Sequence, residues 1–565
     1  MLPAATPSAP PGAVPCPQSS SLAVTDPVAP TTTAPEEEDG EIASVEQSTA
    51  SDEGKAEAEG QEADGSVGDA VWVDWDGPSD PANPLQWSST RKWLVTGCGI
   101  AFCFVVSIAV SAYSIASESI QESFGCSQEL ALLTVTLFTI AFAIVPLVLA
   151  PLSEHYGRSR IYLTTATVHT LFYIPEALVP SLPALLVLRF FSGCAGSAGL
   201  SIVGGTIVDC FAERDRGVPM AAFSLVAFGA PSCGSIIFGY VAERLGYTYI
   251  NWILLALSAS ITLVLFFVLK ETRSTVILAR KASRLQASDA SRRYISVLEQ
   301  QTVGLSVGRK LRTALLRPLT MLATEPVLMA FTAWISFTWG VLYLSLVSIP
   351  IIYKSIYSFS VGETGLVYIS QVVGILVGVG FDRACNILYM RHVATKGPEA
   401  RLYTGLGAAI FVPIGSFFWA FTTYPHVHWV VPCIGMAILY TGMFCCFLCV
   451  HAYLADAYNL YAASALSSML LCRNLVGASF PLFTGILYDR LGIQGASGLT
   501  AGIGTVLSAV PILLFFFGAK LRQRSPFSAE LRQREEALSS SSTAVEKEKP
   551  TAKSEAAMEA KAVEV

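Results

Sequence analysis

The sequence predicts an all-α integral membrane protein in which two bundles of six helices are joined by a long polar loop. The first observation is composition: 52% of the 565 residues are hydrophobic and only 14% are charged, far more apolar surface than the core of a soluble domain needs. The second is a series of twelve apolar runs, each about 20 residues long, the length that crosses a bilayer. The third is a basic, polar gap between the sixth and seventh runs.

The chain begins with a polar tail. Residues 1–70 are rich in Pro, Ala, Ser, Thr and acidic side chains and contain few large apolar residues, so they cannot bury enough surface to fold. We therefore expect a disordered acidic tail over 1–90, whose segment 74–87 precedes the first span. Because the tail is too acidic and too interrupted to be a signal peptide, we expect the first span to direct insertion into the membrane.

Two groups of six predicted spans follow the tail. The N-terminal bundle, 91–270, has spans expected at 92–113, 129–150, 161–180, 184–207, 219–241 and 250–270. The C-terminal bundle, 326–518, has spans expected at 326–349, 361–381, 402–422, 427–452, 461–486 and 498–518. An even number of spans places both termini on the same side of the membrane.

The distribution of Lys and Arg predicts which side that is. The central loop, 271–325, is strongly basic, and alternate loops on the same side hold Arg158, Arg160, Arg214, Arg216, Arg383, Arg391, Lys396 and Arg401. The opposite loops hold only Arg244, Lys354 and Arg490. Because loops rich in Lys and Arg stay in the cytosol, we expect the central loop, the N-terminal tail and a disordered C-terminal tail over 519–565 to be cytoplasmic.

Composition and missing motifs argue against several classes of function. The net charge of −7 is carried mostly by the tails, which disfavours a nucleic-acid partner. The 13 cysteines and six histidines show no metal-binding spacing, so we expect neither a metal nor another cofactor. The chain has no G-x-x-x-x-G-K-[ST] phosphate loop, so ATP hydrolysis is not expected. We do not expect an enzyme.

A motif between the second and third predicted spans connects the sequence to a known family. Residues 150–160, APLSEHYGRSR, resemble the cytoplasmic loop signature of the major facilitator superfamily, G-x-L-x-D/E-x-x-G-R-R/K, with alanine in place of the first glycine and serine between the two arginines. Gly157 permits a tight reversal, and Glu154 can pair with a basic residue or a helix end on a neighbouring span. The resemblance implies a gating loop of Glu154, Gly157, Arg158 and Arg160 that is broken and remade as two halves rock.

A second motif places an arginine inside the fourth predicted span. Residues 189–196, RFFSGCAG, are similar to the superfamily pattern R-F-x-x-G-x-x-G. A buried arginine is expensive unless it is paired or hydrated, so the resemblance implies a functional role for Arg189. The alternative is that the side chain extends to a membrane face and only anchors the helix.

A third motif lies in the fifth predicted span. Gly229, Pro231, Gly234 and Gly239 resemble the glycine- and proline-rich signature of antiporters in this superfamily, although neighbouring positions depart from it. Small residues let helices approach closely, and a proline bends a span. The alternative is ordinary helix packing, which these residues would serve in any transporter.

Several shorter segments narrow the resemblance to the fungal twelve-span drug:proton antiporter family, over about residues 74–520. They include DPANPLQW at 80–87, RPL at 317–319, YLADAY at 453–458 and GASFPLF at 477–483. The resemblance implies the major facilitator fold and a monomeric, proton-coupled exporter of drugs, toxic compounds or endogenous products such as glycolipids or organic acids. It also implies the plasma membrane, with the vacuolar membrane as the alternative. A nutrient importer of the same fold and a sensor that moves nothing remain open.

Proton coupling needs charged or titratable groups within the membrane. The candidates are Arg189, Arg473, Asp456, Glu118 and His451. Arg473 is favoured over the histidine because a charge within a span must face protein or water rather than lipid. The alternative for His451, and for His169, is a hydrogen-bonded packing residue.

Three acidic residues have simple structural alternatives. Glu118 and Glu176 lie near the outer ends of predicted spans, where each could be a solvated loop acid. For Asp209, an ion pair with Arg214 or Arg216 in the same turn is the favoured interpretation.

Aromatic residues within the spans could line a broad apolar cavity for amphipathic cargo. The candidates are Phe138, Phe142, Trp334, Trp339, Tyr343, Tyr440 and Phe444. The alternative is that most of them belong to the packing or to interfacial belts.

Overall fold

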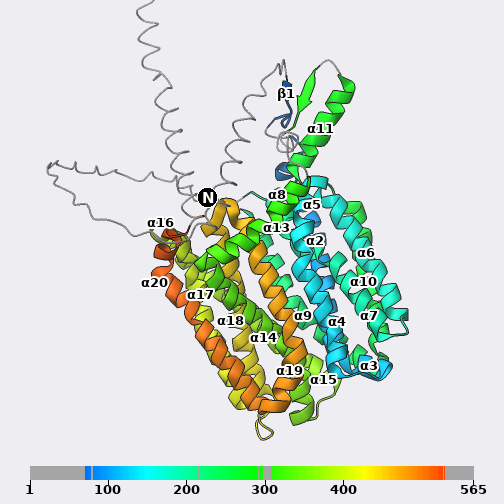
Figure 1. The fold of residues 1–565 in the computed structure, drawn as a ribbon, viewed down its shortest axis with the longest axis vertical. Coiled ribbons are helices and arrows are strands. Elements are labelled where there is room, and N and C mark those ends of the chain that lie inside the picture. Colours follow the sequence, from blue (N-terminus) through cyan, green and yellow to red (C-terminus); the bar gives the residue numbers. More distant parts are fainter. Residues whose placement is uncertain are drawn as a thin grey trace, which may run out of the picture. The chain divides into compact units, whose positions relative to one another are not determined.

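The computed structural model describes residues 70–77, 80–212, 215–289, 292–296, 307–525 and 527, and Figure 1 shows how their helices are arranged. Within these residues almost every element is a helix, and the only strands are two of three residues each. The all-α class predicted from composition is therefore confirmed. The tails over 1–69 and 528–565 lie outside the described residues, and so does Arg214.

The N-terminal bundle is built from helices α2 to α10. Their bounds are Ser89–Ile115 (α2), Ser117–Phe124 (α3), Gln128–Ile144 (α4), Pro146–Tyr156 (α5), Arg158–Leu178 (α6), Leu182–Gly196 (α7), Ala198–Cys210 (α8), Gly217–Leu245 (α9) and Tyr247–Val268 (α10). The second predicted span is divided into α4 and α5 at Pro146, which has no backbone N–H and is tolerated in the first turn of a helix. The fourth predicted span is likewise divided into α7 and α8.

The C-terminal bundle is built from α14 to α20. Its elements are α14 (Pro326–Tyr357), α15 (Val361–Val367), α16 (Ile369–Lys396), the 3-10 turn η3 (Gly397–Arg401), α17 (Leu402–Thr422), α18 (Val430–Tyr458), the 3-10 turn η4 (Asn459–Tyr461), α19 (Ala462–Leu507) and α20 (Ala509–Gln523). The long helix α19 is bent at Gly492, which has φ 70° and ψ 171°. That backbone conformation is available to glycine at little cost, and it separates the eleventh predicted span from the twelfth.

The twelve-span count remains a prediction. Within the described residues, nine helices are long and apolar enough to cross a membrane, or ten if the bent pair α3 and α4 is one span. The single run Ala462–Gln523, 62 residues long, contains the bend at Gly492 and covers two predicted spans. The third predicted span, α6, is not among the nine, since it carries several polar residues and a glutamate.

The central linker is more ordered than a loop. It contains α11 (Ser274–Ser288), strand β2 (Arg293–Ile295) and α13 (Val307–Thr324). Strand β2 pairs in parallel with β1 (Ala70–Trp72), and Lys281 of α11 forms an ion pair with Asp76 at 2.6 Å. The segment from 70 onward, which the sequence predicts as part of a disordered tail, is therefore held against the linker (Figure 1).

The two bundles meet along a seam in which α4 packs against α19 and α9 packs against α15 and α16. Thr136 of α4 donates to the Ala478 carbonyl at 3.1 Å, and Ser232 of α9 donates to Gln371 at 2.7 Å. Hydrogen bonds of this kind can break and form again when the helices on either side of the seam move. The seam is where a transporter of two rocking halves would open.

Candidate functional site

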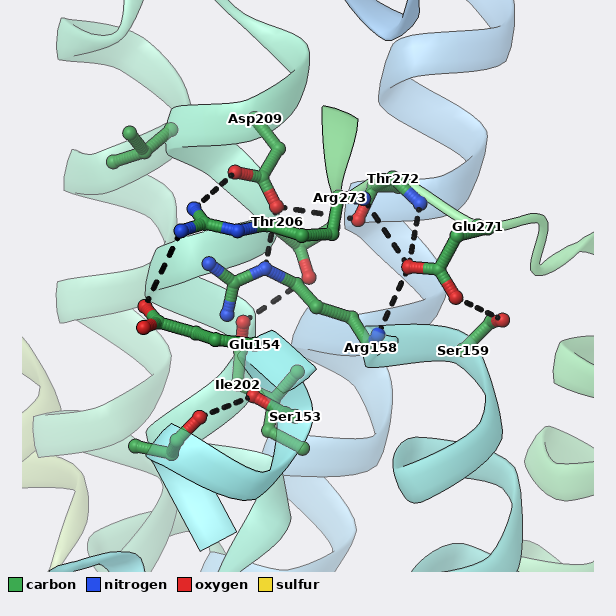
Figure 2. A network of polar contacts seen from close by, with 12 residues as sticks. Ser153, Glu154, Arg158, Ser159, Ile202, Thr206, Asp209, Glu271, Thr272 and Arg273 are labelled. Carbon is green, nitrogen blue, oxygen red and sulfur yellow. Dashed lines mark hydrogen bonds and ion pairs between the residues drawn. The ribbon is translucent and has the colours of Figure 1, made fainter. Parts of the chain in front are cut away.

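The loop motif 150–160, for which a gating role is predicted, contributes to the first polar cluster, at the predicted cytoplasmic end of the N-terminal bundle (Figure 2). Gly157 lies between α5 and α6 with φ 101°, and a Cβ there would lie 2.2 Å from Glu271 Oε2. The reversal predicted for this glycine is present, and a side chain at this position would require the Glu271 carboxylate to move. Glu271 accepts hydrogen bonds from the Arg158 backbone N–H and the Ser159 hydroxyl, both at 2.9 Å. The Glu271 carboxylate therefore accepts a hydrogen bond from the first backbone N–H of α6, which has no acceptor within the helix.

The side chain of Arg158 continues the cluster inward. It forms an ion pair with Asp209 of α8, and both side chains are only 8% exposed. The Arg273 guanidinium lies between two carboxylates, with Nη1 3.5 Å from Asp209 Oδ1 and Nη2 3.9 Å from Glu154 Oε1. Glu154 is 52% exposed, so its contact is weak. These partners, as far as they are described, come from the N-terminal bundle and the segment after α10, so the cluster braces the linker against α5, α6 and α8.

One expectation about this region changes, the partner of Asp209; Arg214, one of its two predicted partners, lies outside the described residues. Asp209 does form ion pairs, but with Arg158 and Arg273. Arg216 instead donates to the backbone carbonyls of Val208 and Phe211, at 3.0 and 2.8 Å. The sequence favoured the nearer arginines because it cannot show which distant residues the fold brings to α8. Arg160, the last member of the motif, is exposed on α6.

A fully buried charge pair forms the second cluster. Arg189 of α7 lies 3.6 Å from the Glu176 carboxylate of α6, and both side chains are 0% exposed. The guanidinium also lies over the rings of Tyr113 and Phe138, 3.8 and 4.2 Å from their centres, which adds cation–π attraction. The arginine therefore does not extend to a membrane face, and Glu176 is not a solvated loop acid.

Neighbouring helices complete this cluster. The Tyr113 hydroxyl lies 3.1 Å from Glu176 Oε2 and 2.8 Å from Asn251 Oδ1, and its single proton can be donated to only one of them at a time. The cluster thus joins α2, α6, α7 and α10. His169 lies nearby, with Nδ1 3.0 Å from the Ser192 carbonyl and Nε2 3.0 Å from the Tyr173 hydroxyl, so it is a hydrogen-bonded packing residue.

Arg473 forms the third cluster and has no comparable partner. Its side chain on α19 is 2% exposed, and its guanidinium lies 4.1 Å from the ring centre of Trp339 and 5.4 Å from that of Phe447. The Nε and Nη1 atoms are buried without a hydrogen-bond partner, and no carboxylate lies within ion-pair distance in the part of the chain that the structure describes. A buried cation in this state is costly.

Arg473 lies beside the seam between the bundles. The adjacent Asn474 donates to the Phe142 carbonyl of α4 at 3.1 Å. Phe228 of α9 packs against Trp339 and Phe447 of the other bundle, with ring centres 5.7 and 5.6 Å apart. The predicted cavity aromatics are all buried, and most gather near this seam or near the buried charge pair: Phe138, Phe142, Trp334, Trp339, Tyr343, Tyr440 and Phe444.

The glycine-rich segment of α9 follows the same seam. A Cβ on Gly239 would lie 3.2 Å from Gly365 Cα of the C-terminal bundle. Gly229 faces Ile375 of that bundle, whereas Gly234 faces α2, since its Cβ would lie 2.6 Å from the Ile108 carbonyl oxygen. Pro231 is buried within α9 between them. The motif therefore permits close approach on both faces of one helix.

Of the remaining candidates, Glu118 and Asp456 form exposed ion pairs away from these buried clusters, whereas His451 packs on the Phe447 ring of the Arg473 cluster, with ring centres 4.1 Å apart. Glu118 forms an ion pair with Lys354 at 2.5 Å, and their side chains are 46% and 61% exposed. Asp456 forms an ion pair with Arg401 at 2.7 Å, with both side chains about one-third exposed. His451 donates from Nδ1 to the Phe447 carbonyl at 2.7 Å, as the packing interpretation expects.

Sequence reasoning passed over Glu271 and Asn251 entirely. Glu271 carries a signal, since it is an acidic residue directly after a predicted span and directly before a basic loop. Asn251 is one amide near the start of a predicted span, and nothing in its surroundings distinguishes it.

Comparison with known proteins gives consistent matches. Residues 97–481 match the sequence profile of the Major Facilitator Superfamily. The chain is 33% identical over 465 residues to the MFS transporter cpaT of Aspergillus oryzae, covering 81% of this chain and 93% of that protein. It is 33% identical over 470 residues to the MFS-type efflux pump MFS2 of Trichophyton rubrum, covering 82% of this chain and 79% of that protein.

A solved structure supports the same fold. The proton:xylose symporter XylE, bound to 6-bromo-6-deoxy-D-glucose, matches with a TM-score of 0.55 and 16% identity, covering 76% of this chain and 96% of that one. At this low sequence identity, the match supports a shared arrangement of helices and does not extend to function.

Proposed function

Because this chain belongs to the major facilitator superfamily, alongside fungal transporters and efflux pumps, we propose that it exports small amphipathic molecules in exchange for protons. The observation that carries the proposal is a pair of buried arginine clusters on either side of α4, one paired with a glutamate and one unpaired. Alternating access in such a fold opens and closes the seam between bundles around a central site. No covalent chemistry is involved, and the chain is not an enzyme.

Glu176 is the proposed proton carrier, and Arg189 its partner. Protonating Glu176 would remove the only charge shown to compensate the buried guanidinium. Losing one partner of a buried pair costs about 3–5 kcal/mol, enough to shift the balance between two conformations. Glu118 and Asp456 are less suited because their exposed pairs already exchange with water.

Helix α4 offers a mechanical link between the proton site and the seam. The ring of Phe138 on α4 contacts the Arg189 guanidinium. One turn further along α4, the backbone carbonyl of Phe142 accepts a hydrogen bond from Asn474, the residue next to Arg473. Between them Thr139 lies 3.4 Å from the Tyr343 hydroxyl of α14. A shift of α4 on protonation of Glu176 would therefore move the contacts that hold the seam closed.

The arrangement of the protein in the membrane is part of the proposal. We propose that the chain works as a monomer in the plasma membrane, with both termini and the central linker in the cytosol, as the distribution of Lys and Arg favours. The gating cluster of Glu154, Gly157, Arg158 and Arg160 would then lie on the cytosolic side. The vacuolar membrane is the alternative location.

Deletion and overexpression strains of the source organism test the direction of transport. A compound that moves from medium to cytoplasm on deletion, and back on overexpression, identifies the cargo and supports export. Reduced uptake of a nutrient on deletion, with no compound retained, would favour the importer that this fold also permits.

Purified protein in liposomes tests the coupling. Glu176→Gln is expected to abolish flux driven by a pH gradient while leaving exchange of cargo across the membrane. Glu118→Gln is the matched control, since it removes an exposed acid. Equal loss of gradient-driven flux in the two variants, or none in Glu176→Gln, would contradict the assignment of Glu176.

A further inference from the structure

The two buried arginines differ in one respect that bears on the cargo. Arg189 is compensated by Glu176 at 3.6 Å, whereas the described surroundings of Arg473 supply aromatic rings and no carboxylate. A guanidinium stays charged in proteins, and an uncompensated charge away from water is unfavourable. The charge at Arg473 is therefore available to a partner that enters from outside the chain.

The unpartnered groups beside Arg473 are hydrogen-bond donors. They are Nε and Nη1 of Arg473 and the indole Nε1 of Trp339, all buried. The rings of Trp339 and Phe447 contact the guanidinium without accepting bonds from these two nitrogens. Nε and Nη1 lie on different edges of the guanidinium, so either of them can donate one charge-assisted hydrogen bond to a carboxylate oxygen, and such bonds are stronger than those between neutral groups.

Further unpartnered polar side chains continue along one face of α14. Trp339, Ser336 and Thr332 are spaced at i, i−3 and i−7, and the hydroxyl groups of Ser336 and Thr332 are buried without a hydrogen-bond partner. Residues at this spacing share one side of a helix. The series runs from Arg473 toward the start of α14 at Pro326, which is the predicted cytoplasmic end. These three residues thus form a row of unpartnered polar groups on one side of α14.

We propose that Arg473 binds an anionic group of the cargo, and that the transported molecules are aromatic acids carried as anions. The proposal rests on the proposed export function, because it assigns the substrate class of the same central site. Trp339 and Phe447 would contact the ring system of the cargo, and Arg473 would pair with its carboxylate. Opening the seam at the Asn474–Phe142 contact exposes the guanidinium to the space between the bundles.

Binding to three probes that share one ring system tests the assignment. The probes are 1-naphthylacetate, its amide 1-naphthylacetamide and 2-(1-naphthyl)ethylamine, titrated calorimetrically into purified full-length protein at pH 7. The wild type is expected to bind the acid at least about tenfold more tightly than the amide or the amine, the scale of one good charge-assisted pair. Equal affinities, no binding of any probe, or tighter binding of chloride than of the acid would overturn the proposal.

Substitution of Arg473 tests whether this residue causes the preference for the acid over the amide and the amine. Arg473→Gln is expected to lose the tenfold preference and to keep the affinity for the amide, while Arg473→Lys keeps part of the preference. Arg391→Gln, which changes an exposed arginine on α16, is expected to behave as the wild type. Thermal unfolding of each variant checks that it is folded. A folded Arg473→Gln protein that still prefers the acid would overturn the proposal.

Flux in liposomes separates this proposal from the export function. If a pH gradient moves the amide or the amine at the same rate as the acid, the proposed anion site is wrong and the proposed export function is retained. If the protein binds the acid preferentially through Arg473 but shows no gradient-driven flux, the proposed anion site is retained and the proposed export function is wrong.

Discussion

The buried pair of Glu176 and Arg189 predicts that each single neutralisation is more harmful than the two together. The side chains are fully buried with Nη1 and Oε2 3.6 Å apart. Glu176→Gln leaves an uncompensated arginine, and Arg189→Gln leaves an uncompensated carboxylate. Each is expected to lower the free energy of unfolding by about 3–5 kcal/mol, the usual cost of removing one partner of a buried pair.

The double variant should recover much of that loss. With both residues changed to Gln no charge is buried, and the remaining cost is a few altered hydrogen bonds, about 1–2 kcal/mol. Independent effects would instead add to roughly 6–10 kcal/mol. Reversible unfolding by SDS in mixed micelles, followed by tryptophan fluorescence, measures the difference. A double variant as unstable as the sum of the singles would refute the pairing.

The dependence on pH provides a second check on the same variants. In Arg189→Gln, Glu176 can take up a proton and become neutral, so the destabilisation should shrink as the pH is lowered. In Glu176→Gln the guanidinium stays protonated, so the destabilisation should not change over the same range. A constant deficit in Arg189→Gln would mean that its cost comes from packing rather than from an unpaired charge.

Two further variants examine the ends of the bundles. Gly157→Ala should lower the free energy of unfolding by about 1–2 kcal/mol and slow flux, because the backbone has φ 101° and the new Cβ would meet the Glu271 carboxylate. Gly97→Ala, where a Cβ meets nothing within 4 Å, is the control in the same SDS unfolding and flux assays, and equal effects would contradict the contact. Glu118→Gln should cost less than about 1 kcal/mol in the SDS unfolding assay, because its pair with Lys354 is exposed. A loss above about 2 kcal/mol would contradict the expectation that this exposed pair contributes little to stability.

Part of the site was predictable from local sequence. Gly157 lies in a turn because the motif around it places a helix on each side, and a positive φ there is what a glycine in that position allows. A buried Arg189 was one of two interpretations of its place in an apolar, family-like motif, the other being a side chain that extends to a membrane face. For Gly157 the chemical requirement and its signal lie within a few residues of each other.

Other parts were not predictable because they depend on partners far along the chain. Glu176 was open to interpretation as a loop acid until the packing of α6 on α7 placed it beside Arg189. Asp209 has two arginines nearby in sequence, yet it pairs with Arg158 and Arg273, which are 51 and 64 positions away. The burial of a charge and the choice of its partner are properties of several helices at once.

The sequence by itself determined the class of this protein, an all-α membrane protein, because apolar length is a local quantity. The bounds of the two bundles and the count of twelve spans stay predictions. The tertiary structure alone decided which charges are compensated. It gave Arg189 a carboxylate and surrounded Arg473 with aromatic rings. Two arginines within apolar runs look alike in the sequence, and only the packing of α4, α14 and α19 around the seam makes them different.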